Sequence, residues 1–156
     1  MSLTTDMLHE LLEYNDGKLF WKVSRGRVKA GSEAGVLQSN GYVRVKLNSK
    51  SYQAHRLVYM LVHGHIPNNL YIDHIDGNKS NNRIENLRTV THQENLHNMR
   101  NAKGYYKHPC GKWCAQIHRD GTVLNLGLFT HEEEAREAYL EAKKKYHPST
   151  PTDYYA

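Results

Sequence analysis

Residues 71–95 read YIDHIDGNKSNNRIENLRTVTHQEN, and this stretch decides the fold around it. Its first apolar residues predict a short strand that ends at Asp73 and His74. Asp76-Gly77-Asn78 predicts a turn, because these residue types tolerate left-handed backbone conformations. A second short strand then runs to Val90. The stretch therefore begins as a pair of strands joined by a polar loop.

The end of the same stretch predicts a helix. Thr91, followed three residues later by Glu94, forms a capping box, which is typical of a helix N-terminus. Asn95 then falls in the first helical turn. We therefore expect a strand pair followed by a helix, an arrangement that brings Asp73 and Asn95 together from opposite ends of one compact motif.

The motif resembles the HNH nucleases, above all their homing-endonuclease branch, whose core is a ββα-metal fold. The resemblance runs from Asp73-His74 through the Asp-Gly-Asn loop and Asn86-Leu87-Arg88 to Asn95. With His55-Arg56-Leu57 upstream, it covers about residues 52–98. It implies that His74 is the general base and that Asn86 braces the loop and helps to orient the histidine. It also implies that Asp73 and Asn95 bind one divalent metal.

The implied ligands favour a hard cation. Many members of the family have histidine as the third signature residue, but here it is Asn95, as in the His-Asn-Asn variants. One carboxylate and one carboxamide oxygen suit Mg²⁺ or Mn²⁺, completed by water and phosphate oxygens, better than Zn²⁺. The chemistry agrees, because phosphodiester hydrolysis needs a base tuned near pH 7, which the imidazole of His74 supplies. Phosphodiester hydrolysis also needs positive charge beside the phosphate, which a bound metal ion supplies. The products of such hydrolysis would carry 5′-phosphate and 3′-hydroxyl ends.

Upstream of this motif the chain is strongly basic. The 156 residues carry 21 Lys and Arg against 16 Asp and Glu, a net charge of +5. Between Lys18 and Arg56, nine basic residues face one acid, Glu33, which leaves +8 on this segment (9 − 1). Charge alone fits a solvated face equally well, but aromatic residues in the segment favour a folded surface for nucleic acid. The candidate DNA contacts here are Arg25, Arg27, Lys29, Arg44, Lys46 and Arg56.

The N-terminal region predicts a helix, a small antiparallel sheet and a second helix. Thr5 can cap the first helix, whose apolar stripe includes Leu12 and which ends at Asn15-Asp16-Gly17. Alternation in residues 42–47 predicts a half-buried strand with a basic outer face. The second helix covers residues 56–63 and ends at Gly64.

The region after Gly104 predicts a separate module of three strands (105–107, 113–119 and 123–128) and a helix over 131–146, capped by Thr130 with Glu133. Through its Gly-Tyr-Tyr, Trp-Cys-Ala-Gln-Ile and Leu-Gly-Leu-Phe segments, it resembles the ethylene-response-factor (Apetala-type) DNA-binding domain over about residues 103–147. That resemblance implies that the open face of the sheet enters the major groove. Its candidate contacts are Tyr106, His108, Lys112, Gln116, His118 and Asn125.

The same strands offer a zinc site as an alternative, formed by His108, Cys110, Cys114 and His118. Residues 114 and 118 lie about 13 Å apart on an extended strand, however, which is too far for one tetrahedral ion.

The sequence as a whole thus predicts an α+β protein with an HNH domain over 1–101, an Apetala-type module over 102–147 and a tail over 148–156. Its expected partner is double-stranded DNA, which a monomer with one site would nick. A double-strand break would need a dimer or two sequential nicks. No run of about 18 apolar residues and no secretory signal are visible, so we expect an intracellular, cytoplasmic protein. The resemblance to homing endonucleases implies an enzyme of phage or intron origin that acts in a bacterial cell. A non-catalytic DNA-binding protein and an RNA-binding or RNA-cleaving protein are the alternatives.

Overall fold

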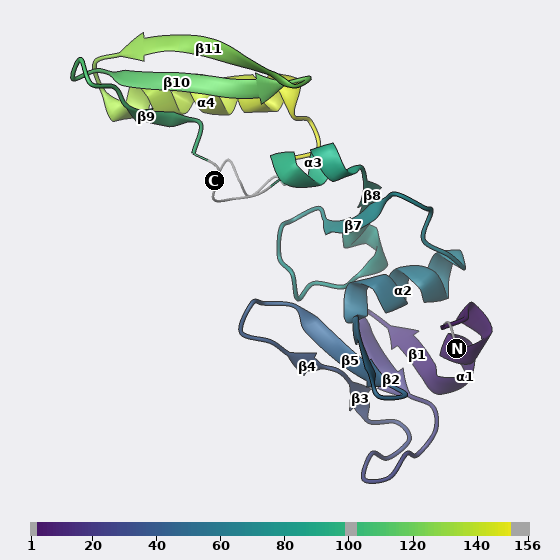
Figure 1. The fold of residues 1–156 in the computed structure, drawn as a ribbon. Helices are drawn as coiled ribbons and strands as arrows, with labels where there is room; N and C mark the ends of the chain where they lie inside the picture. The colour runs from purple at the N-terminus through teal and green to yellow at the C-terminus, as the bar shows by residue number, and fades with distance from the viewer. Residues whose placement is uncertain (1–2, 99–102, 151–156) are drawn as a thin grey trace. The chain divides into compact units, whose positions relative to one another are not determined.

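The computed structural model describes residues 3–98 and 103–150 and shows short helices with small antiparallel sheets, which confirms the α+β fold class (Figure 1). The chain divides into two compact units, Met1–His92 and Gln93–Ala156. The predicted boundary at 101/102 lies outside the described residues. No helix in the described ranges has the length and apolar character needed to cross a membrane.

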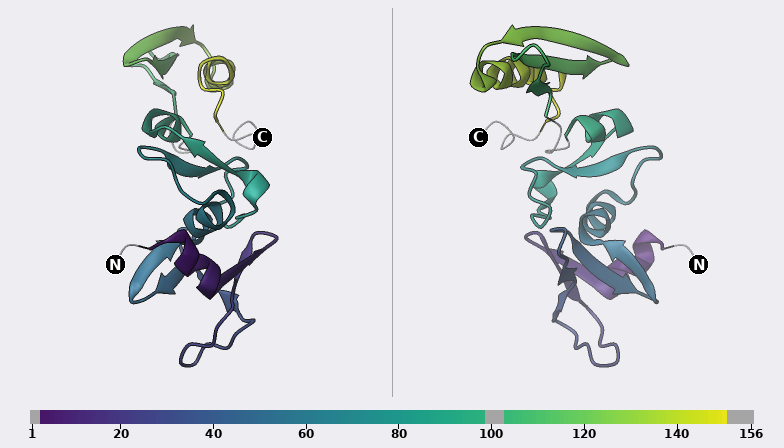
Figure 2. Two further views of the ribbon diagram at one scale, coloured as in Figure 1. Left: turned by 90° about the vertical axis from the view of Figure 1, so that its right-hand side faces the viewer. Right: turned by 60° about the vertical axis from the view of Figure 1, so that its left-hand side comes forward.

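The first unit contains two three-stranded sheets and a strand pair. The sheets have the strand orders β1-β2-β3 and β4-β5-β6, and β7 pairs with β8. In both further views of Figure 2 the loop between β2 and β3 extends away from the other elements of this unit. The elements are α1 Thr5–Leu11, β1 Leu12–Asn15, β2 Lys18–Trp21, β3 Glu33–Ala34, β4 Val36–Leu37, β5 Val43–Leu47, β6 Lys50–Gln53, α2 Ala54–His63, β7 Tyr71–His74, the 3₁₀ turn η1 Ile84–Asn86 and β8 Leu87–Val90.

One hydrophobic core joins these elements. Leu8 of α1, Val45 of β5 and Val58 of α2 are each at most 1% exposed. Ile72 of β7 and Leu87 of β8 belong to the same cluster, at 8% and 7% exposure. The strand pair that carries Asp73 and His74 is therefore anchored to the N-terminal sheets and α2 by shared apolar packing.

The first helix is shorter than the sequence predicts. It ends at Leu11, and residues 12–15 form β1, which pairs antiparallel with β2. Asp16 and Gly17 adopt φ angles of 45° and 85°, as a two-residue hairpin turn requires. Cross-strand pairing and burial of Leu12 thus replace the expected last helical turn. The cap is also one residue earlier than predicted, because the Thr4 hydroxyl accepts from the backbone N–H of Met7.

The second unit contains a short helix and a sheet covered by a long helix. The sheet has the order β11-β10-β9, and α4 packs against one of its faces (Figure 1). Ile117 of the sheet and Tyr139 of α4 lie at the centre of its core. The elements are α3 His92–His97, whose first residue belongs to the other unit, β9 Tyr105–Lys107, β10 Trp113–Arg119, β11 Thr122–Phe129 and α4 Glu132–Tyr146.

The strands of this module follow the prediction, but the cap of its helix does not. The backbone N–H of His131, not of Thr130, donates to the carboxylate of Glu134, so the capping box lies one residue later than predicted. Of the predicted tail over 148–156, residues 151–156 lie outside the described part, whereas Thr150 is buried and Ser149 donates to the side chain of Asn98.

Candidate active site

The β7–β8 pair places the central residues of the motif at its open end. Asp73 lies opposite Arg88 and His74 opposite Leu87 in the antiparallel register. The loop over 75–86 connects the two strands, and its ends are tied by a hydrogen bond from the Ile75 N–H to the Asn86 carbonyl. Asp73 and His74 point to opposite faces, as successive strand residues must.

The imidazole of His74 is buried and held by a hydrogen bond. The residue is 3% exposed, and its Nε2 lies 3.0 Å from Oδ1 of Asn82. Asn82 is itself 3% exposed. Asn82 is not among the site residues predicted from the sequence. Nothing in the polar loop marks it for burial, so this contact becomes visible only in the structure.

Two aromatic rings lie against His74. The ring centroid of His55 is 5.0 Å away in an edge-on arrangement, and that of Tyr42 is 6.1 Å away. Burial, followed by the nearby charges of His74 and Arg56, lowers the pKa of His55 to about 3, so His55 is neutral near pH 7. Burial and the Asp73 carboxylate raise the pKa of Tyr42, which keeps its hydroxyl protonated. The neighbours of His74 on this side are therefore uncharged rings.

Asn86 makes its side-chain contacts with the loop. Its Nδ2 donates to Oδ1 of Asp76 at 2.9 Å and to the carbonyl of Asn81 at 2.8 Å, and its Oδ1 accepts from the Asp76 N–H at 3.0 Å. Burial opposes ionisation of Asp76, but hydrogen bonds from Asn81 and Asn86 outweigh it and lower the pKa of the Asp76 carboxyl. Asp76 is thus the acceptor around which the loop folds.

Asp73 forms an ion pair on the other face of the strand. Arg88 donates to Oδ2 of Asp73 from Nε at 3.2 Å and from Nη2 at 2.9 Å. The side chain of Asp73 is 15% exposed. A carboxylate at this position suits a hard cation, and the neighbouring guanidinium would weaken cation binding until phosphate supplies further negative charge.

Asn95, the second proposed ligand, lies on α3 in the second unit. Its pairing with Asp73 stays a prediction. The oxygen donors of the pair fit Mg²⁺ or Mn²⁺ by their chemistry. Within residues 3–98 and 103–150, no group of three or more His, Cys, Asp or Glu side chains could hold a metal ion, so this region shows no site built only from those side chains.

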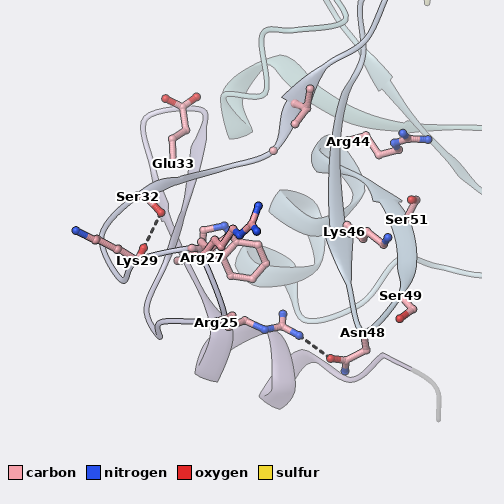
Figure 3. A pocket seen from close by; sticks show the side chains of 14 residues that line it. Arg25, Arg27, Lys29, Ser32, Glu33, Arg44, Lys46, Asn48, Ser49 and Ser51 are labelled. Carbon is pink, nitrogen blue, oxygen red and sulfur yellow. Dashed lines mark hydrogen bonds between the residues drawn. The ribbon is translucent and has the colours of Figure 1, made fainter.

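A basic groove of about 960 Å³ lies in the first unit, next to the N-terminal sheets. Figure 3 shows that its cationic side chains come from two elements, the loop after β2 and strand β5. Arg25 donates to Asn48 at 2.8 Å and lies over the ring of Trp21. Glu33, an acid in the lining, pairs with Lys18 at 2.9 Å. The structure thus gathers five of the six predicted cations, namely Arg25, Arg27, Lys29, Arg44 and Lys46.

Arg56, the sixth, lies on α2 and is not among the residues that line the groove. It is exposed, and its charge contributes to the low pKa of His55.

The predicted reading face of the second unit is the sheet face opposite α4. Ala115 and Ile117 are 0% and 2% exposed, and Ile117 belongs to the core that includes Tyr139 of α4. Tyr106, Lys112, His118 and Asn125 are exposed, whereas His108 and Gln116 are partly buried. A register shift in β11 at this point lets Oδ1 of Asn125 accept from the Gly127 N–H. The role of this face in DNA binding stays a prediction.

The zinc alternative gains no support from the described residues. β10 runs through residues 113–119 as a continuous extended strand, which keeps Cys114 and His118 apart as expected. Cys114 is 4% exposed, and Nδ1 of His108 lies 3.0 Å from Sγ of Cys110.

Comparisons with known proteins identify the central region. Residues 52–97 match the family model described as HNH endonuclease. An uncharacterized HNH endonuclease of Acanthamoeba polyphaga mimivirus is 35% identical over 107 residues, which cover 66% of this chain and 57% of that protein. The DNA endonuclease I-HmuI of Bacillus phage SP01 is 39% identical over 66 residues, covering 40% of this chain and 38% of that protein.

A solved structure that shows DNA binding and cleavage by the HNH homing endonuclease I-HmuI is 30% identical to this chain. It aligns with a TM-score of 0.44 over 56% of this chain and 51% of that one. The chain thus covers between 38% and 57% of the length of these relatives. Residues 52–97 carry an HNH endonuclease domain, and a homing endonuclease is among its relatives.

Proposed function

We propose that the protein is a metal-dependent endonuclease that hydrolyses phosphodiester bonds of double-stranded DNA. The observation that carries the proposal is a buried histidine, His74, next in sequence to the carboxylate of Asp73 on strand β7, within the HNH endonuclease domain. A buried imidazole with one ring nitrogen held by a hydrogen bond is suited to proton transfer through the other nitrogen.

In the proposed mechanism His74 takes a proton from the attacking water, and the water oxygen bonds to phosphorus as the 3′ oxygen leaves. Asn86 keeps the loop in place through Asp76 and Asn81. Asp73 and Asn95 would hold Mg²⁺ or Mn²⁺. When bound, such an ion would supply positive charge that stabilises the crowded phosphorane and the leaving oxygen. The products would carry 5′-phosphate and 3′-hydroxyl ends.

Binding of the duplex would rest on two surfaces, one in each unit. The groove cations would contact phosphates, which gives affinity and salt dependence without sequence information. The exposed sheet face with Lys112 and His118 would add contacts further along the duplex. One active site per chain makes a nick the expected product, and a double-strand break would require two chains or two successive cuts.

The test is cleavage of duplex DNA and structured RNA of matched length, each with Mg²⁺, Mn²⁺ or EDTA, followed by sequencing of the ends. The proposal predicts cleavage of the DNA with either metal, loss in EDTA, recovery on adding metal, and 5′-phosphate ends. Preferential RNA cleavage or full activity in EDTA would contradict it. DNA binding without cleavage under any of these conditions would favour the non-catalytic alternative.

A further inference from the structure

The loop that faces His74 contains a side chain with no assigned role, Asn82. Its Oδ1 lies 3.0 Å from Nε2 of His74, and both residues are 3% exposed. An amide oxygen only accepts hydrogen bonds. With Oδ1 as the acceptor, Nε2 carries the proton in this contact, which leaves the lone pair of the neutral ring on Nδ1.

The position of Asn82 is fixed from the N-terminal hairpin. Arg83, the next residue, pairs with Asp16 of the β1–β2 turn at 2.8 Å. The N–H of Ile84 donates to the hydroxyl of Tyr14 on β1 at 2.9 Å. A Cβ atom added to Gly17 would lie 3.0 Å from the backbone nitrogen of Arg83, so hairpin and loop are in close contact. Residues 82–84 are thus held by an element more than 60 residues earlier in the chain.

We propose that Asn82 is a positioning residue that fixes the ring of His74 with its proton on Nε2, so that Nδ1 receives the proton of the attacking water. In that step an O–H bond of water breaks, an Nδ1–H bond forms and the ring becomes imidazolium. The water oxygen bonds to phosphorus, the bond from phosphorus to the 3′ oxygen breaks, and the leaving 3′ oxygen takes a proton from solvent. This inference rests on the proposed endonuclease function. It also gives the N-terminal hairpin a role in catalysis besides its place beside the basic groove.

The rings around His74 support the same role. The ring centroid of His55 lies 5.0 Å from that of His74 in an edge-on arrangement, and the centroid of Tyr42 lies 6.1 Å away, so both rings pack around the imidazole. Packing thereby fixes the ring plane, and Asn82 fixes which nitrogen carries the proton. Neither ring places a charge beside His74 near pH 7, since the pKa of His55 is about 3.

The first measurement needs no cleavage. In ¹⁵N-histidine-labelled full-length protein, the Nε2–H of His74 should give an exchange-protected imidazole proton signal, assigned by its absence in His74→Gln. The signal should disappear in Asn82→Ala and persist in Asn82→Asp, whose carboxylate still accepts. A His74 ring protonated on Nδ1 in the neutral wild-type protein, or a signal that persists in Asn82→Ala, would overturn the proposal.

The second measurement is single-turnover cleavage of duplex DNA. Asn82→Ala should lower the single-turnover rate constant by about 10- to 100-fold, the usual cost of losing an orienting partner. The DNA Kd should stay within a few-fold of wild type. Asn82→Asp should recover most of that loss. Tyr14→Phe should lower the single-turnover rate constant by a smaller factor. The control Tyr59→Phe, which removes a hydroxyl from the ring beside His63 on α2, should keep the wild-type rate constant.

Failure of the positioning role and failure of the endonuclease assignment give different results. Suppose that wild type cleaves DNA, that His74→Gln does not, and that Asn82→Ala keeps the wild-type single-turnover rate constant. The positioning role is then wrong, and the endonuclease assignment stands. If wild type cleaves nothing, the endonuclease assignment fails, and the imidazole proton still shows whether Asn82 holds the ring. If Asn82→Ala does not fold, the imidazole proton signal of the wild-type protein and the cleavage rate of Tyr14→Phe test the positioning role in its place.

Discussion

Arg44 and Lys46 extend from β5 into the basic groove, and replacing both with glutamine tests whether the groove holds DNA phosphates. Each phosphate contact contributes about −0.9 to the slope of log K against log salt, so the double variant should have a slope shallower by about 1.8. Raising the salt concentration fourfold, from about 50 to 200 mM, should lower the binding constants of both proteins. The factor by which the variant's binding constant falls should be about 12 times smaller than the factor for wild type.

The assay is fluorescence anisotropy of a labelled duplex titrated with protein in EDTA, which prevents turnover, at four or more salt concentrations. The matched control is Lys22→Gln with Lys50→Gln, which removes the same charge from residues outside the groove lining. A slope for Arg44→Gln/Lys46→Gln equal to that of wild type would show that the groove does not hold DNA phosphates. So would an equal change in the control, because the effect would then come from net charge and not from contacts in the groove.

Three further expectations concern other parts of the chain. Gly104→Ala should destabilise the second unit by about 1–3 kcal/mol in urea unfolding, because its Cβ would lie 2.0 Å from the Tyr139 ring and 2.6 Å from the Gln116 carbonyl; an unchanged midpoint would contradict this. His55 has its pKa lowered from 6.5 to about 3, so between these pH values the unfolded chain binds a proton that the folded chain does not. Stability should therefore fall as pH drops below 6.5, by up to about 1.4 kcal/mol per pH unit from this group, and His55→Gln should show a shallower loss. Lys112→Gln with Gln116→Ala should weaken DNA binding and shorten the footprint at matched salt, and an identical footprint would show that this face does not engage DNA.

The strand pair was predictable because its sequence signals are local. Apolar residues before Asp73, turn residues at 76–78, and Leu87 and Val90 at the two ends of the second strand indicate β7 and β8 from nearby residues alone. The same holds for the strands of the second unit and for the helix that ends at Gly64.

The errors lie where two local signals compete. Leu8, Leu11 and Leu12 fit one helical stripe, but Asp16-Gly17 is also a hairpin turn, and pairing of β1 with β2 decides for the strand. At residues 130–134 two overlapping capping boxes are possible, and the structure selects the one in which Glu134 accepts from His131.

Long-range contacts could not be predicted from spacing alone. The hydrogen bond from Ile84 to Tyr14 joins residues 70 apart, and nothing in either segment specifies the other. The same limit applies to the buried contact of Asn82 with His74, since an asparagine in a polar loop gives no sign of its burial.

The most direct test of the central claim is to measure cleavage rate and DNA affinity together for His74→Ala and wild type in Mg²⁺. If His74 is the general base, the substitution should lower the single-turnover rate by about 10²–10⁴. The DNA Kd should stay within a few-fold of wild type, because the residue makes no proposed phosphate contact, and circular dichroism should show the same fold. A folded His74→Ala protein that cleaves duplex DNA at the wild-type rate would contradict the claim.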